Sequence, residues 1–188
     1  MRFKRSIMLV VVGASASGKT EIANTLVNQY HYIKSITSTT RDKRVYEIDD
    51  IHYHFLSKEQ FQHKLNQQAF VETNEYQDRM YGLQKDEIGP NKIIILDPNG
   101  CNALYRLYPN ETCIVYIHSE KEIRQTRMLA RGDDPYQISK RILEDDTIFN
   151  IKHLDKIHLI IDNHHQTILS IAQDIHAFYQ RFTKGENL

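Results

Sequence analysis

The sequence predicts an α/β fold with three layers, in which helices cover both faces of a parallel β-sheet. Short apolar runs begin near Ile7, Ile33, Ile93 and Ile114, and helical patterns lie between them. Continuous β-branched runs are typical of strands that are buried on both faces of a parallel sheet. Because strands and helices alternate along the chain, we expect a parallel sheet with helices on both faces.

The composition indicates one globular domain. The chain has 188 residues, of which 40% are hydrophobic and 26% are charged, so it can bury a core and is not expected to be disordered. It has 24 basic and 24 acidic residues, and this balance removes the general electrostatic argument for nucleic-acid binding. Cys101 and Cys113 are too few for a disulfide framework. No apolar run reaches the roughly 18 residues of a membrane span, so we expect a cytoplasmic protein without membrane partners.

The first predicted strand leads directly into a phosphate-binding motif. Residues 13–20 fit G-x-x-x-x-G-K-[ST], the P-loop pattern, and a helical pattern follows. Backbone N–H groups of such a loop surround phosphate oxygens at the start of the helix. We expect Lys19 to contact the β- and γ-phosphates and Thr20 to bind Mg²⁺. The predicted phosphate-binding residues are Gly13, Ala14, Ser15, Ala16, Ser17, Gly18, Lys19 and Thr20. The motif alone does not distinguish a hydrolase, a kinase and a motor protein.

A polar segment then carries a second set of candidate binding residues. Arg41 and Arg44 follow a hydroxyl-rich strand end, and arginine side chains bind phosphate oxygens in a bidentate manner. Ser57 and Gln60 form a capping-box pattern, which predicts a short helix after Ser57.

In this order the motifs resemble the guanylate kinase family, from about Leu9 to Phe182. The resemblance rests on S-x-T-S-T-T-R-x-x-R at residues 35–44, on Tyr53 and Glu72, and on Tyr81-Gly82. It implies a single domain over residues 1–188. Within it, an inserted lobe over about 37–83 would bind GMP, a helical lid would span about 127–141, and a core would comprise 1–36 and 84–188.

The resemblance also implies roles for residues of the inserted lobe. Glu72 would accept hydrogen bonds from N1–H and the 2-amino group of guanine, a pair of donors that adenine lacks. Thr37 stands where the family usually has a serine that contacts the base. The residues implied to hold the GMP phosphate are Arg41, Arg44, Tyr53 and Tyr81.

Further site residues are expected beyond this lobe. Asp97 ends the strand run at residues 92–97 and should face the nucleotide crevice. It resembles a family aspartate near Mg²⁺ and the acceptor phosphate; the alternative is a turn-forming aspartate before Pro98. Arg127, Arg131 and Arg141 resemble the arginines of the family lid, where they would neutralise transition-state charge. Arg127 and Arg131 would also contact ATP. The residues implied to be catalytic are Lys19, Arg44, Arg131 and Arg141.

The implied reaction is transfer of the γ-phosphoryl group of ATP to GMP, which gives ADP and GDP. Mg²⁺ would accompany ATP as co-substrate, and the enzyme would be a monomer or a homodimer. The acceptor phosphate has a second pKa of about 6, by analogy with phosphoserine, so it is already ionised near neutral pH. No general base is therefore expected.

Leu83 departs from the family pattern, because a serine or threonine usually follows Tyr-Gly. The loss of one neutral hydrogen bond costs about 0.5–1.5 kcal/mol. This departure leaves open a related P-loop kinase with another phosphorylated acceptor, such as a ribosyl-bisphosphate phosphokinase. A catalytically silent guanylate-kinase-like binding module is the second alternative, although such modules typically lose the P-loop lysine and the lid arginines.

The remaining patterns concern helix ends and histidines. Ser119 with Glu122 predicts a capping box, and Asn163 with Gln166 resembles a cap. Asp133-Asp134-Pro135 predicts a break between two helices. The chain has 10 histidines, among them the neighbouring pairs at 52/54 and 164/165. Because no carboxylate or cysteine completes a ligand set at a familiar spacing, we expect no metal site at these pairs.

Overall fold

A computed structural model describes residues 7–45, 47–76, 78–164 and 166–186. Both ends of the predicted 1–188 domain, and His165, therefore lie outside the described residues. The central sheet has the strand order β2-β7-β1-β8-β9, and every neighbouring pair is parallel. Its strands are β1 (Met8–Val12), β2 (Ile33–Lys34), β7 (Lys92–Ile95), β8 (Thr112–His118) and β9 (Leu159–Asp162). The predicted parallel α/β fold is confirmed.

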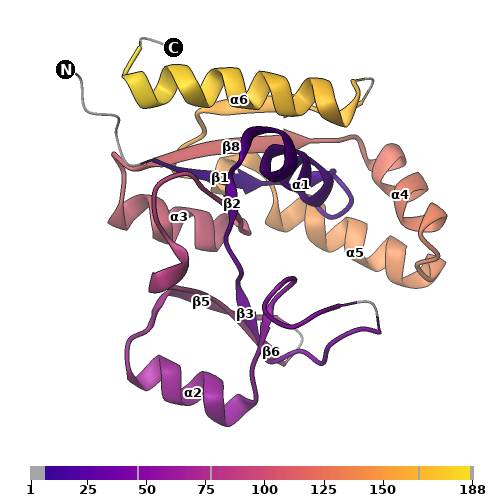
Figure 1. Ribbon diagram of the computed structural model, residues 1–188. Helices are drawn as coiled ribbons and strands as arrows, with labels where there is room; N and C mark the ends of the chain where they lie inside the picture. Colours follow the sequence, from indigo (N-terminus) through magenta and orange to yellow (C-terminus); the bar gives the residue numbers. More distant parts are fainter. Residues whose placement is uncertain (1–6, 46, 77, 165, 187–188) are drawn as a thin grey trace.

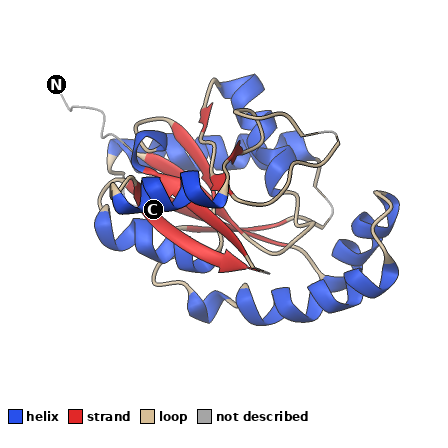
Figure 2. Ribbon diagram, turned by 90° about the horizontal axis from the view of Figure 1, so that it is seen from below, coloured by secondary structure: helices blue, strands red, loops and turns tan. Residues whose placement is uncertain are grey.

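Helices cover both faces of this sheet (Figures 1 and 2). On one face α1 (Lys19–Tyr30) and α6 (Ile168–Lys184) pack against each other and enclose the β1 residues Leu9 and Val11. On the other face α3 (Pro98–Leu107) covers Met8, Val10 and Val12. Successive residues of a strand point to opposite faces, which explains why every residue of β1 is buried. Among the described residues, no helix is both long and apolar enough to cross a membrane.

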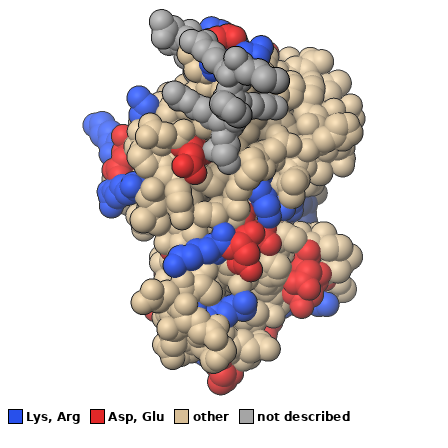
Figure 3. Space-filling view, turned by 60° about the vertical axis from the view of Figure 1, so that its left-hand side comes forward, with Lys and Arg blue, Asp and Glu red and all other residues tan. Residues whose placement is uncertain are grey.

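A second, four-stranded sheet lies apart from the central sheet and has the order β4-β3-β6-β5. Its strands are β3 (Ser38–Thr39), β4 (His54–Phe55), β5 (Phe70–Tyr76) and β6 (Arg79–Gln84). With α2 (Lys58–Asn66) it forms the lower part of the molecule in Figure 1. We call residues 38–84 the small lobe. A constriction separates it from the sheet above in Figure 3, where acidic and basic side chains are interspersed.

The helix of the small lobe begins as its sequence predicts. The Ser57 side chain accepts a hydrogen bond from the Gln60 backbone N–H, and the Gln60 side chain accepts one from the Ser57 N–H. Phe61 is fully buried and stacks on Phe70, with ring centroids 4.5 Å apart. This stacking joins α2 to β5. Short 3₁₀ helices η1 (Lys85–Glu87) and η2 (Ile151–His153) occupy two connections elsewhere.

A helical pair projects from one end of the central sheet. It consists of α4 (Lys121–Ala130) and α5 (Pro135–Ile148), separated by the predicted break. Met128 of α4 packs against Ile138 and Ile142 of α5 in a small buried cluster of its own. We call residues 121–148 the α4–α5 pair.

Two of the predicted helix caps are wrong. The N-cap of α4 is Glu120 without a side-chain cap, because Ser119 lies one position too early. The N-cap of α6 is Thr167, whose hydroxyl accepts a hydrogen bond from the Ser170 N–H at 3.1 Å. Asn163 instead donates its side-chain N–H to the Ser17 carbonyl at 2.8 Å. A long-range contact to the P-loop therefore replaces the local cap that the pattern suggested.

Candidate active site

The P-loop connects β1 to α1, and its two glycines occupy positions that no larger residue fits. At Gly13 a Cβ atom would lie 2.4 Å from the Ile117 carbonyl oxygen. Gly18 has a φ of 99°, in the left-handed region, and a Cβ there would lie 2.4 Å from the Asn163 side chain. Close packing against β8 and the turn after β9 therefore requires glycine at both ends of the loop.

Lys19 is the first residue of α1 and folds back onto the loop. Its Nζ atom donates to the Ala14 carbonyl at 2.7 Å. Burial lowers the pKa of Lys19 to about 8, and the charges of Asp145 and Glu21 partly oppose this shift. The ammonium group is thus held inside the loop, where it is poorly hydrated and available to an anion.

A first cavity opens beside the P-loop and brings together six predicted ATP-binding residues. The members of that set that line it are Ala16, Gly18, Lys19, Thr20, Arg127 and Arg131. Arg127 is fixed in place by donating to the Ala16 carbonyl and to the Asn163 carbonyl, each at 3.1 Å. The same cavity reaches Gln166 and Thr167 before α6. It therefore extends from the phosphate loop to α4 and to the turn that follows β9.

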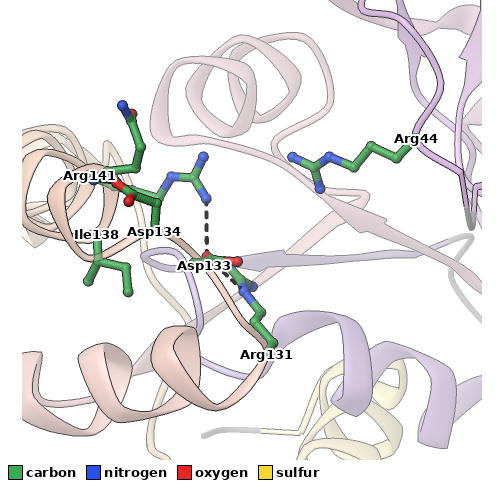
Figure 4. A pocket seen from close by; sticks show the side chains of 7 residues that line it. Arg44, Arg131, Asp133, Asp134, Ile138 and Arg141 are labelled. Carbon is green, nitrogen blue, oxygen red and sulfur yellow. Dashed lines mark hydrogen bonds and ion pairs between the residues drawn. The ribbon is translucent and has the colours of Figure 1, made fainter.

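A second cavity lies between the small lobe and the α4–α5 pair (Figure 4). Arg44 points into it from the small lobe, while Arg131 and Arg141 approach from the other side. Asp133 lies between Arg131 and Arg141, 2.9 Å from Arg131 Nε and 3.9 Å from Arg141. The hydrogen bond from Arg131 lowers the pKa of Asp133. Three of the four residues predicted to be catalytic thus share this cavity, and Arg131 also lines the first one.

A third cavity is lined both by the P-loop and by residues implied to bind the acceptor, GMP. Tyr53, Tyr81 and Asp97 line it together with Arg141 and Ser15. The rings of Tyr53 and Tyr81 meet edge to face, with centroids 6.4 Å apart. Three of the residues implied to bind GMP therefore share this cavity with Ser15 of the P-loop.

Asp97 has two partners at this position. Its Oδ1 atom caps α3 by accepting from the Gly100 N–H at 2.8 Å. Its Oδ2 atom accepts from the side chain of Asn74, also at 2.8 Å. Asp97 therefore caps α3, and the same side chain also lines the third cavity.

Glu72 lies beside this cavity and is not one of its lining residues. Its carboxylate rests against the first turn of α3, where a Cβ at Gly100 would be 3.2 Å from Oε1. Burial and the charge of Asp97 raise the pKa of Glu72 to about 7, while an interaction with the Leu83 backbone opposes the shift. Glu72 is thus a partly buried acid that ionises near neutral pH.

Arg41 and Thr37 do not line any of these three cavities. Arg41 donates from one nitrogen to both carboxylate oxygens of Glu47, at 2.7 and 2.9 Å. Its guanidinium lies over the Tyr53 ring, 5.5 Å from the centroid. In this arrangement the Arg41 guanidinium packs against the Tyr53 ring, and its charge is paired with the buried Glu47 carboxylate.

Asp145 is a site residue that the sequence patterns did not single out. Its carboxylate accepts a hydrogen bond from the Ser15 N–H in the P-loop at 2.7 Å. It also lies 3.6 Å from the Arg124 guanidinium, and both side chains are buried. Asp145 is one helical turn after Arg141 on α5, so it ties the helix that carries Arg141 to the P-loop. The only signal for this role in the sequence is that Asp145 lies four residues after Arg141, a spacing that places both side chains on the same face of a helix.

Known proteins are similar to this chain in sequence. A family model described as guanylate kinase matches residues 5–175. A guanylate kinase of Wolinella succinogenes is 29% identical over 92% of this chain and 86% of its own length. One of Symbiobacterium thermophilum is 30% identical over 74% of this chain and 70% of its own length.

A solved structure shows the same fold. The crystal structure of guanylate kinase from Anaplasma phagocytophilum superposes with a TM-score of 0.71 and 19% identity, over 94% of this chain and 86% of that one. Because the family model spans nearly the whole chain, the resemblance inferred from the motifs is confirmed. The chain belongs to the guanylate kinase family.

Proposed function

We propose that this chain transfers the γ-phosphoryl group of ATP to GMP and thereby forms ADP and GDP. The observation that carries the proposal is the third cavity, where Ser15 of the P-loop, Arg141 and the acceptor-side tyrosines meet. A triphosphate held by the loop would place its γ-phosphate toward this cavity. Family membership supports the same reaction.

Positioning and charge account for catalysis in this proposal. Lys19 would leave the Ala14 carbonyl to contact the β- and γ-phosphates, and Arg127 would remain as a support for the loop. Arg44, Arg131 and Arg141 already share one cavity, so together they could neutralise the phosphoryl group in flight. Arg131 and Arg141 would exchange their pairing with the Asp133 carboxylate for the more highly charged phosphates.

Tyr53 and Tyr81 would bind the acceptor phosphate with their hydroxyl groups, and Arg41 would hold Tyr53 in place. Glu72 would read the guanine edge, with Thr37 as a second contact on the neighbouring segment. In its present pairing Arg41 acts on the acceptor through Tyr53; direct contact with the phosphate would require the small lobe to rearrange. The lobe at about 37–83 would thus close over GMP, and the lid at about 127–141 over ATP.

The donor set near the P-loop fits Mg²⁺. Thr20 offers a hydroxyl oxygen at the start of α1, and Asp97 offers a carboxylate across the third cavity; hard oxygen donors and phosphates are what Mg²⁺ prefers. Bound Mg²⁺ would neutralise charge on the β- and γ-phosphates. Since this chain alone supplies every site residue, a monomer or a homodimer would suffice. A cytoplasmic location would give the enzyme access to both nucleotides.

Leu83 bears on the choice of acceptor. It is fully buried in the apolar cluster with Cys101 and Leu104. It therefore supplies packing at a position where the family pattern has a hydroxyl. Glu72, on the paired position of the neighbouring strand, keeps the carboxylate that guanine recognition needs.

The test is a phosphoryl-transfer assay with ATP and Mg²⁺ against GMP, dGMP, AMP, UMP, CMP and ribosyl bisphosphate. We expect GMP and dGMP to be phosphorylated and AMP to be rejected. Preference for ribosyl bisphosphate would assign the related phosphokinase activity instead. GMP binding without transfer to any acceptor would indicate the silent binding module.

A further inference from the structure

Two histidines and a carboxylate meet at the carboxyl edge of the central sheet, on the two turns that follow β8 and β9. His118 ends β8 and is paired in register with Asp162, the last residue of β9. His164 follows two residues later. Each of the three side chains offers a ligating atom that lies within 4.8 Å of those of the other two. Because β8 and β9 pair in parallel register, His118 and Asp162 lie opposite each other although they are 44 positions apart in the chain.

We propose that His118, Asp162 and His164 bind a divalent transition-metal ion of the zinc class, at a site separate from the Mg²⁺ that accompanies ATP. Two imidazole nitrogens and one carboxylate oxygen are a ligand set that Zn²⁺ accepts, with a fourth position left for water or another side chain. Mg²⁺ and Ca²⁺ prefer oxygen donors throughout. The donor types therefore favour zinc over the ions that nucleotides carry.

The three side chains are already close to a coordinating arrangement. His118 Nδ1 lies 2.7 Å from Asp162 Oδ1, so a carboxylate fixes the orientation of that ring. The rings of His118 and His164 have centroids 5.3 Å apart. The His118 and Asp162 side chains are 47% and 67% exposed, which gives a hydrated ion direct access. Little side-chain movement is needed to bring the donors to a common ion.

Glu120 contacts His164 through both its side chain and its backbone. Its Oε1 atom lies 3.6 Å from His164 Nδ1. Its backbone N–H, at the start of α4, donates to His164 Nε2 at 3.1 Å. Ligation through Nε2 would exchange that hydrogen bond for a bond to the metal. Bound metal would then connect the end of β8, at His118, to the turn that carries Asn163 and His164.

This location gives the ion a structural effect. Asn163 donates to the P-loop carbonyl of Ser17, and its own carbonyl accepts from Arg127 of α4. The ion would therefore link two segments that already meet at the edge of the first cavity. Because it binds the folded arrangement and not separated strands, it should raise thermal stability with the logarithm of its concentration once that concentration exceeds the Kd.

The test uses the full chain, stripped of metals with a chelator and returned to buffer with excess Mg²⁺. Isothermal titration with Zn²⁺ should show one ion per chain, and Co²⁺ should give the visible absorption of a low-coordinate site with histidine ligands. His118→Ala and His164→Ala should each weaken Zn²⁺ affinity at least tenfold and abolish the zinc-dependent rise in melting temperature. His63→Ala, which removes an exposed histidine on α2, is the matched control and should bind as the parent does.

Three results would overturn the proposal. They are the absence of Zn²⁺ binding to the parent chain, equal Zn²⁺ affinity in a His118→Ala/His164→Ala double variant, and displacement of the ion by millimolar Mg²⁺. Circular dichroism of each variant without metal separates loss of the ligand from loss of the fold. Asp162→Asn provides a second route, since it keeps the side-chain volume and should also weaken binding. None of these outcomes depends on phosphoryl transfer.

Discussion

Replacing Glu72 by glutamine should stabilise the chain without nucleotide and impair its selection of guanine. In the folded state the pKa of Glu72 is raised from 4.5 to about 7, chiefly by burial and secondly by Asp97. Between these two values the unfolded chain releases the proton while the folded chain keeps it. Stability therefore falls as pH rises from 4.5 toward 7 and is constant above it.

The size of this effect follows from the shift. Between pH 5 and pH 8 the linkage amounts to about 2.5 kcal/mol, or roughly 2 kcal/mol after allowance for the solvent that still reaches the side chain. Glu72→Gln removes this titration, so the variant should gain about 2 kcal/mol over the parent on going from pH 5 to pH 8. Urea denaturation at both pH values measures the difference. Glu75→Gln, an exposed change on the same strand, is the control.

The same substitution should reduce discrimination between GMP and AMP. A carboxylate accepts from both guanine donors, whereas a carboxamide offers one oxygen and can turn its N–H groups toward adenine. Hydrogen bonds to a charged group contribute about 1.5–3 kcal/mol, so the ratio of kcat/KM for GMP over AMP should fall about 10- to 100-fold. Intact selectivity in Glu72→Gln would refute the guanine assignment. An unchanged pH dependence of stability would refute the buried-acid argument separately.

Three further substitutions test other parts of the site. Lys19→Ala should lower kcat about 100-fold, because it removes a contact worth about 3 kcal/mol to the transferring group. Lys152→Ala, which changes an exposed lysine, is the control and should leave kcat unchanged. A Lys19→Ala variant that retains most of its activity would disprove the role of Lys19. Asp145→Ala should lower the free energy of unfolding by about 2 kcal/mol in chemical denaturation. The substitution leaves the Ser15 N–H without its acceptor and removes a buried partner of Arg124. A variant as stable as the parent chain would contradict this reasoning. Leu83→Thr should lower the KM for GMP about three- to tenfold in steady-state assays if the hydroxyl reaches the base. The loss of buried apolar surface in this variant should cost about 1–3 kcal/mol of stability. An unchanged KM would show that Leu83 does not limit GMP binding.

Local patterns in the sequence were sufficient for the architecture and for the motifs. The continuous apolar run of β1 predicted a strand buried on both faces, and Ser57 with Gln60 predicted the start of α2. The P-loop spacing predicted phosphate binding because it depends on backbone geometry within eight consecutive residues. Such signals act over one turn or one strand, so the chain encodes them without reference to the rest of the fold.

Tertiary structure decided which side chains meet. Arg41 looked like a phosphate clamp, yet its guanidinium pairs with Glu47 beneath Tyr53. Asp145 contacts Ser15 across 130 residues, a pairing that depends on how α5 docks beside the P-loop. The sequence suggested that no carboxylate completed the set at His164, whereas strand register brings Asp162 and His118 beside it. Contacts of this kind depend on strand order and helix docking, which sum many weak long-range interactions that no local spacing records.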